Sequence, residues 1–193
     1  MKASFTITGT SPLLMHNPLG MANQNKGKSK IKKGAQEFDP AEDAEAGTYR
    51  TEKGDLYVPS IALRSCLING CKGMKIGKLG AKTIIAGAVE ITDLPCVLYE
   101  PKSRKPISTY EIDTRRAVIQ KQGILRSRPK IFPWALDWEI DYDPDFVSPN
   151  TIEEILQRAG VLVGLLDYRP EKSGPFGKFT AEYKAEQGGA GPG

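Results

Sequence analysis

The sequence is poor in the residues from which catalytic and metal sites are usually built. It contains one histidine, His16, and three cysteines, Cys66, Cys71 and Cys96, which are odd in number and form no C-x-x-C pair. It shows no Ser-His-Asp arrangement, no cluster of metal ligands and no phosphate-binding P-loop. We therefore interpret the cysteines as small buried hydrophobic residues in a reducing cytoplasm, and we expect no metal ion and no cofactor.

Long hydrophobic runs are also missing. No run approaches the roughly 18 apolar residues that a membrane-spanning helix needs, and no apolar signal region follows Met1. The chain has 193 residues, of which 39% are hydrophobic and 26% charged, as is typical of one soluble globular domain. We expect a cytoplasmic protein without membrane contact, folded as a single domain over 1–184 with a disordered tail at 185–193.

Positive charge, by contrast, is concentrated in particular segments. Residues 101–131 include nine basic and two acidic side chains, whereas residues 134–154 include seven acidic side chains and no basic one. A second basic cluster, KGKSKIKK, occupies residues 26–33. Clusters of Lys and Arg are typical of proteins that bind nucleic acid. The alternative is a solvated surface that happens to be basic.

Hydrophobic periodicity predicts the order of secondary structure. Alternating apolar residues indicate a strand at 3–8 and a longer one at 134–142, where Trp134 and Trp138 alternate with carboxylates and are assigned to the core. Further strands are predicted in TIIAGAVEI, LPCVLYE and KFTAEY. Helices are predicted at 60–73, with Ser60 as N-cap, and from Ser148-Pro149 to a point before Pro170.

This βαββαβ order predicts an α+β fold of the ferredoxin-like (RRM-like) type, with two helices on one face of an antiparallel sheet. Two additions are expected on this core. One is a mobile loop at about 18–50, with a short helix around 40–49, because the segment is polar and has few large apolar residues. The other is a long basic insertion at about 99–131 between the middle strands.

Three short motifs resemble the RAMP superfamily of CRISPR-associated proteins. GDLYVPSIALRSCL is similar to that superfamily's strand-to-helix entry, SGPFGKF to its glycine-rich loop, and TGTSPLLMHN to its first strand and exit. The loop departs from the family pattern, because Pro175-Phe176 stands between its glycines where the family has more glycines and an Arg. The insertion at about 99–131 is similar in position to the thumb of backbone-type subunits, which polymerise along a guide RNA. A virus-encoded relative would fit the same motifs.

The residues predicted to contact nucleic acid are basic side chains and loop glycines. Arg126 and Arg128 lie two residues apart in an extended segment, so they point to one side at a spacing suited to successive phosphates. The N–H groups of Gly174 and Gly177 are expected to approach a phosphate, unless the loop is a plain turn. The full set is Arg64, Lys102, Arg104, Lys105, Arg115, Arg116, Lys121, Arg126, Arg128, Lys130, Lys172, Gly174, Gly177 and Lys178. Tyr110 and Phe132 flank the insertion and are candidates for base stacking or for ordinary packing.

Three functional hypotheses follow. The first is a non-catalytic, sequence-independent binder of single-stranded nucleic acid, RNA in preference to DNA. It would assemble head-to-tail, with the acidic surface at 137–154 against a neighbour's basic surface and with other subunits of a ribonucleoprotein complex as possible partners. The second is a RAMP-type RNA-processing endonuclease that uses His16. The third is a protein-interaction module or inhibitor that mimics a backbone subunit. We favour the first and predict that the protein is not an enzyme.

Overall fold

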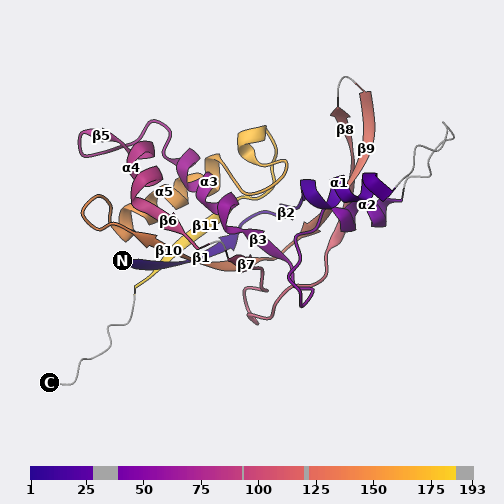
Figure 1. Ribbon diagram of the computed structural model, residues 1–193, viewed down its shortest axis with the longest axis horizontal. Coiled ribbons are helices and arrows are strands. Elements are labelled where there is room, and N and C mark those ends of the chain that lie inside the picture. The colour runs from indigo at the N-terminus through magenta and orange to yellow at the C-terminus, as the bar shows by residue number, and fades with distance from the viewer. Residues whose placement is uncertain (28–38, 93, 120–121, 186–193) are drawn as a thin grey trace.

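A four-stranded antiparallel sheet forms the centre of the computed structural model (Figure 1), which describes residues 1–27, 39–92, 94–119 and 122–185. The strands lie in the order β11-β1-β10-β6. Their bounds are β1 Lys2–Gly9, β6 Val89–Ile91, β10 Ala135–Tyr142 and β11 Phe179–Lys184. Counted along the chain, this is fourth-first-third-second with antiparallel neighbours throughout, as in the ferredoxin-like arrangement. The predicted α+β, ferredoxin-like fold is confirmed.

Helices cover one face of this sheet (Figure 1) and bury its apolar side chains. They are α3 Ser60–Gly70, α4 Ala81–Ala88 and α5 Pro149–Leu162. Phe5 and Ile7 of β1 are fully buried, and so are Trp134 and Trp138, which confirms the predicted core tryptophans. The indole Nε1 of Trp138 donates to the Ser60 hydroxyl at 2.9 Å. Ser60 is the first residue of α3 rather than its cap, and its hydroxyl satisfies a buried donor instead.

The outer edge of the sheet at β11 is closed by side chains of α5. The Gln157 amide donates to the Ala181 carbonyl, and the Tyr183 N–H donates to Glu153 Oε1 at 3.0 Å. These two contacts occupy backbone groups that another strand would otherwise pair with. Addition of a strand at this edge is therefore disfavoured.

The segment TIIAGAVEI differs from its prediction. It was expected to be a strand, but Ala81–Ala88 form α4 and only Val89–Ile91 form β6. The residues Ala81, Ile84 and Ile85 are buried at helical spacing, so the apolar run packs one helix face on the core. Short strand pairs precede and follow α4: β4 Lys75–Ile76 with β5 Leu79–Gly80, and β3 Tyr57–Pro59 with β7 Pro95–Val97.

The segment expected to be a mobile loop at 18–50 contains two helices, α1 Pro18–Gly27 and α2 Pro40–Ala46. The predicted short helix around 40–49 is confirmed as α2, which begins after the capping side chain of Asp39. Asp43 and Ala44 are buried, so α2 packs against its neighbours although its sequence is largely polar. Most of the basic cluster at 26–33 lies outside the described residues.

The basic insertion forms a β-hairpin of β8 Glu111–Ile119 and β9 Gln122–Ile131. It makes a second sheet of order β2-β9-β8 with β2 Leu13–Leu14. Figure 1 shows the hairpin beside α1 and α2, at the end of the molecule away from α4. The second core helix also ends earlier than expected, at Leu162, because Gly164 follows with a left-handed φ of 73°. Among the described residues, no helix is both long and apolar enough to cross a membrane.

Candidate nucleic-acid interface

A cleft of about 410 Å³ lies where α3, the segment after β2 and the loop that follows α5 meet. We call residues 164–178 the glycine-rich loop; they include the 3₁₀ turn η1 Pro170–Lys172. The polar and titratable side chains that line the cleft are those of His16, Tyr49, Ser65, Cys66, Asp167 and Arg169. Burial raises the pKa of the Cys66 thiol to about 12, so this cysteine stays protonated and is not a nucleophile at neutral pH.

Backbone hydrogen bonds place His16 at this cleft. The N–H of Met15 donates to the Pro129 carbonyl of β9 at 3.0 Å, and the N–H of Asn17 donates to the Gly47 carbonyl after α2, also at 3.0 Å. The segment is therefore fixed on both sides of His16 by contacts with elements far away in the sequence. The position of the imidazole follows from these bonds and not from any local motif.

The environment of His16 favours its neutral form. Desolvation by burial is the main cause that lowers its pKa from 6.5, and the charges of Arg128 and Arg126 act in the same direction. The nearby carboxylates of Asp167 and Asp43 oppose the shift. Nδ1 of the ring is buried and has no hydrogen-bond partner among the described residues. A neutral imidazole at a cleft is able to accept a proton.

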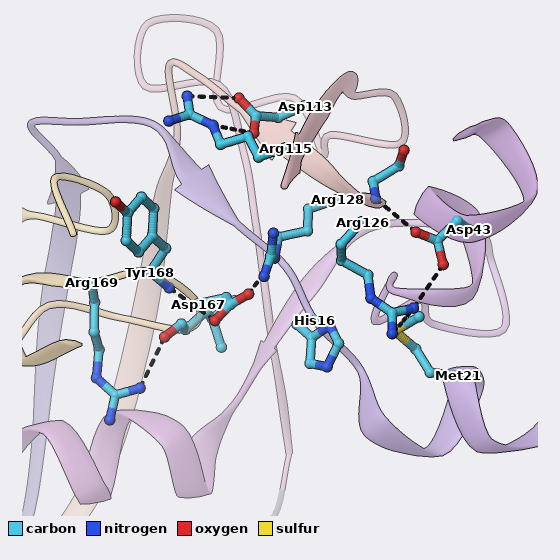
Figure 2. A network of polar contacts seen from close by, with 12 residues as sticks. His16, Met21, Asp43, Asp113, Arg115, Arg126, Arg128, Asp167, Tyr168 and Arg169 are labelled. Atoms are coloured by element: carbon cyan, nitrogen blue, oxygen red, sulfur yellow. Dashed lines mark hydrogen bonds and ion pairs between the residues drawn. The ribbon is translucent and has the colours of Figure 1, made fainter. Parts of the chain in front are cut away.

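Arg126 and Arg128 were predicted to bind phosphates, but in the structure each forms an ion pair with a carboxylate of the same chain. Arg126 Nη1 donates to Asp43 Oδ1 at 2.9 Å, and Arg128 Nε donates to Asp167. Their side chains are only 21% and 16% exposed, so each cation needs a partner to offset its desolvation. Figure 2 shows His16 between these two ion pairs. The predicted same-side orientation is present, but that side faces α2 and the glycine-rich loop.

The glycine-rich loop uses its amides internally. The N–H of Gly174 donates to the Arg169 carbonyl at 3.0 Å, and that of Gly177 donates to the Pro12 carbonyl at 2.8 Å. Neither amide is therefore free to bind a phosphate in this conformation, which corrects the expectation for these two glycines. Lys172, an exposed residue of the loop, and Lys178, which is half-buried, remain candidates for phosphate contact.

Other predicted basic residues lie in several places. Lys102, Arg104 and Lys105 are exposed in the turn after β7, and Arg115 and Arg116 are exposed on β8. Arg64 donates to the Ala86 carbonyl of α4 at 2.8 Å, so it faces α4. Lys130 pairs with Glu111 at 2.7 Å. Lys121 lies outside the described residues. Arg116 has no ion-pair partner in the part of the chain that the structure describes.

The acidic strand meets basic side chains of its own chain. Asp137 accepts hydrogen bonds from Lys184 at 2.7 Å and from Arg104 at 2.5 Å, while Glu139 pairs with Lys2 at 2.6 Å. Much of the charge complementarity that the sequence suggested between neighbouring molecules is thus satisfied inside one molecule. Contact between copies through 137–154 stays a prediction.

The open face of the central sheet offers no platform for bases. The side chains of β1, β10 and β11 that point away from the helices are polar, charged or small, and none of the described ones is aromatic. RRM-type binding depends on aromatic rings at that face. Of the two predicted stacking residues, Tyr110 donates to Glu45 at 2.7 Å and is half-buried, whereas Phe132 is 55% exposed.

No protein-family model and no curated protein matches the chain. Among solved structures, the chain is similar to a Cas6 product complex, with 10% identity over 94% of this chain and a TM-score of 0.26. The chain spans about half the length of that protein, at 50%. A likeness this remote assigns no role to any residue of this chain.

The prediction that the protein is not an enzyme is contradicted by this comparison. The solved structure to which the chain is similar is a product complex of Cas6. The absence of a Ser-His-Asp arrangement, a metal-ligand cluster and a P-loop from the sequence therefore does not exclude catalysis.

Several residues of the cleft were not predicted from the sequence. Tyr49, Asp167 and Arg169 line the cleft. Asp43 does not line it, but it pairs with Arg126 as Asp167 pairs with Arg128. Asp167 and Arg169 belong to the sequence DYRP, between the second core helix and the glycine-rich motif, and no local pattern there marks them as part of a site. The partners themselves come from distant segments and left no local pattern.

Proposed function

We propose that the protein binds single-stranded RNA through its phosphate backbone, with the strand lying across the surface where the β8–β9 hairpin meets the glycine-rich loop and over the cleft at His16. The observation that carries this proposal is the set of exposed cations on the hairpin and the loop. Arg115 and Arg116 are exposed on β8, where they point to opposite faces of the hairpin, and Lys172 is exposed on the loop. Arg169 lines the cleft but pairs with Glu171 at 2.7 Å. The resemblance to the RAMP superfamily, whose backbone subunits hold guide RNA, favours RNA over DNA.

Binding of this kind is electrostatic, so its salt dependence tests the proposal. We expect affinity for single-stranded RNA to fall linearly with salt on logarithmic axes, and Arg116→Ala and Lys172→Ala each to reduce the slope by about 0.7 if each contacts one phosphate. Lys75→Ala is the matched control, because Lys75 is an exposed lysine on β4 beside α4. Fluorescence anisotropy with single-stranded RNA and DNA of equal sequence measures both affinity and preference. Absence of salt-dependent binding to either strand would exclude the proposal.

A second function, cleavage of the bound RNA, is favoured by the state of His16. The imidazole lines the cleft, its Nδ1 has no partner among the described residues, and burial lowers its pKa so that the neutral base dominates at pH 7. In such a reaction, the imidazole takes the proton of a ribose 2′-hydroxyl. The 2′-oxygen then attacks the adjacent phosphorus, and the 5′-oxygen leaves and takes a proton from water. The product strand ends in a cyclic phosphate, and no metal ion takes part.

Labelled RNA incubated with the protein in EDTA tests this second function. We expect cleavage that is lost in His16→Ala and in an RNA with a 2′-deoxy group at the cut position, while binding persists in both cases. If the RNA stays intact after incubation with the wild-type protein, the cleavage function is excluded and only the binding function remains. Cleavage that survives in His16→Ala would place the chemistry elsewhere.

A further inference from the structure

The side chain of Tyr168 stands at the edge of the cleft. Its neighbours Asp167 and Arg169 both line the cleft, whereas the Tyr168 ring lies outside it and is 41% exposed. Its backbone has a φ of 47°, in the left-handed region that aromatic residues rarely adopt. An exposed aromatic ring that is held by an unfavourable backbone needs an explanation, because such conformations persist only when the surroundings impose them.

The surrounding loop imposes this conformation through specific contacts. The N–H of Tyr168 donates to Asp167 Oδ1 at 2.9 Å, and the Tyr168 carbonyl accepts from the N–H of Phe176 at 3.3 Å. Arg169 Nη1 donates to the Leu166 carbonyl at 2.9 Å, which fixes the preceding turn. Gly174 passes so close to the Tyr168 carbonyl that a Cβ at this position would collide with it. The loop is therefore rigidly folded around the exposed ring.

The ring belongs to a small surface, formed by Tyr168, Phe176 and Arg115, where the loop meets the hairpin. We call this surface the ledge. Its centroid lies 5.9 Å from that of Phe176, which is buried, and the two rings are tilted by 35°. The guanidinium carbon of Arg115 lies 4.9 Å from the Phe176 centroid. Arg115 itself uses Nε and Nη2 to bind Asp113. Figure 2 shows Arg115 and Tyr168 with this network, beside the ion pairs around His16. The ledge thus presents an exposed ring and an exposed cation that both lie against Phe176.

We infer that this ledge is a nucleobase-binding site: one base of the bound strand stacks on Tyr168, and Arg115 contacts the phosphate next to it. The inference rests on the proposed RNA-binding function and adds a fixed position to it. A base stacked there would place the following part of the backbone at the residues 167 and 169, which line the cleft. Every base has a flat face, so such stacking holds the strand in place without selecting its sequence.

The test uses single-stranded RNA that carries 2-aminopurine, whose fluorescence is quenched when it stacks on an aromatic ring. We expect Tyr168→Ala to weaken binding by roughly 5-fold to 150-fold and to abolish the quenching that the ring causes. Tyr168→Phe should bind and quench like the wild-type protein. Tyr168→Gly distinguishes loss of the ring from disturbance of the backbone. Glycine adopts a positive φ freely, so this variant removes the ring and keeps the loop in place. It should lose affinity as Tyr168→Ala does.

Phe146→Ala is the matched control, because Phe146 is an aromatic residue with 55% exposure that does not line the cleft. It should leave both affinity and quenching unchanged. If the wild-type protein, Tyr168→Ala and Tyr168→Gly all bind RNA with the same affinity and the same salt dependence, the ledge is not a base-binding site. The proposed RNA-binding function would still hold. No binding of the wild-type protein to any strand would overturn both.

Discussion

Arg128 of β9 forms an ion pair with Asp167 of the glycine-rich loop, across 39 residues of sequence. This contact ties the hairpin to the loop directly beside His16 (Figure 2). Arg126 pairs with Asp43 in the same way. Two arginines of the basic run therefore stabilise the structure around the cleft. The free cations are consequently those whose side chains point away from these pairs, such as Arg116.

The Arg128 pair should contribute to stability more than to binding. We expect Arg128→Ala to lower the free energy of unfolding by about 1–2 kcal/mol, because a largely buried, charged hydrogen bond is lost while Asp167 keeps some contact with water. Urea denaturation followed by tryptophan fluorescence measures the loss. Arg128→Lys, which keeps the charge but not the planar guanidinium, should lose less. If Arg128→Ala left stability unchanged but reduced the salt slope of RNA binding, Arg128 would be a phosphate contact, as its sequence position suggested.

Stability should depend on the protonation of His16. Because the pKa of His16 is lower in the folded protein than the ordinary 6.5, the unfolded chain binds more protons once the pH falls below about 6.5. The folded state therefore loses stability from about pH 6.5 downward, until the folded imidazole is protonated as well. We expect His16→Gln to show a smaller loss between pH 7 and about pH 5.5, where most carboxylates are still ionised. Equal losses in both proteins would contradict a lowered pKa.

Two helical glycines should respond oppositely to the same substitution. Gly160 of α5 lies against the Phe179 carbonyl of β11 without room for a Cβ, so Gly160→Ala should push the helix off the strand. We expect a loss of about 1–3 kcal/mol in the free energy of unfolding. Gly87 of α4 has open space around it, and Gly87→Ala should stabilise the helix by about 0.5–1 kcal/mol. Thermal and urea unfolding of the two variants provide the comparison, and a neutral Gly160→Ala would contradict the close packing.

Assembly along a strand stays a prediction that solution experiments can test. If copies pack head-to-tail on bound RNA, the mass of the complex measured by light scattering should rise in steps with RNA length. Added salt should shorten the assemblies, since the Debye length is only about 8 Å at physiological ionic strength. Lys2→Ala removes the basic partner of Glu139, and Lys184→Ala removes one of the two basic partners of Asp137. Both substitutions should change this assembly if the acidic strand forms the contact. A single copy on RNA of every length would instead favour the interaction-module hypothesis.

The sequence by itself determined the central sheet and its core. The unbroken alternation over 134–142 encodes which side of β10 is buried, because successive side chains of a strand point to opposite faces. The same local logic placed α3 and α5 and gave the ferredoxin-like order. It failed at TIIAGAVEI, where a short apolar run fits a strand and a buried helix equally well, and only packing on the core made Ala81–Ala88 helical.

Only the tertiary structure decided which partners the arginines of the basic segment have. A run of Arg and Lys has the same sequence whether its partners are phosphates or the protein's own carboxylates. Asp43 and Asp167 come from a helix and a loop far from β9, and their ion pairs with Arg126 and Arg128 exist only once the chain has folded. The position of His16 was decided in the same way, by backbone bonds to Pro129 and Gly47. The burial pattern of a strand or helix can be predicted from neighbouring residues in the sequence. The partner of a charged side chain cannot, because it comes from a distant segment.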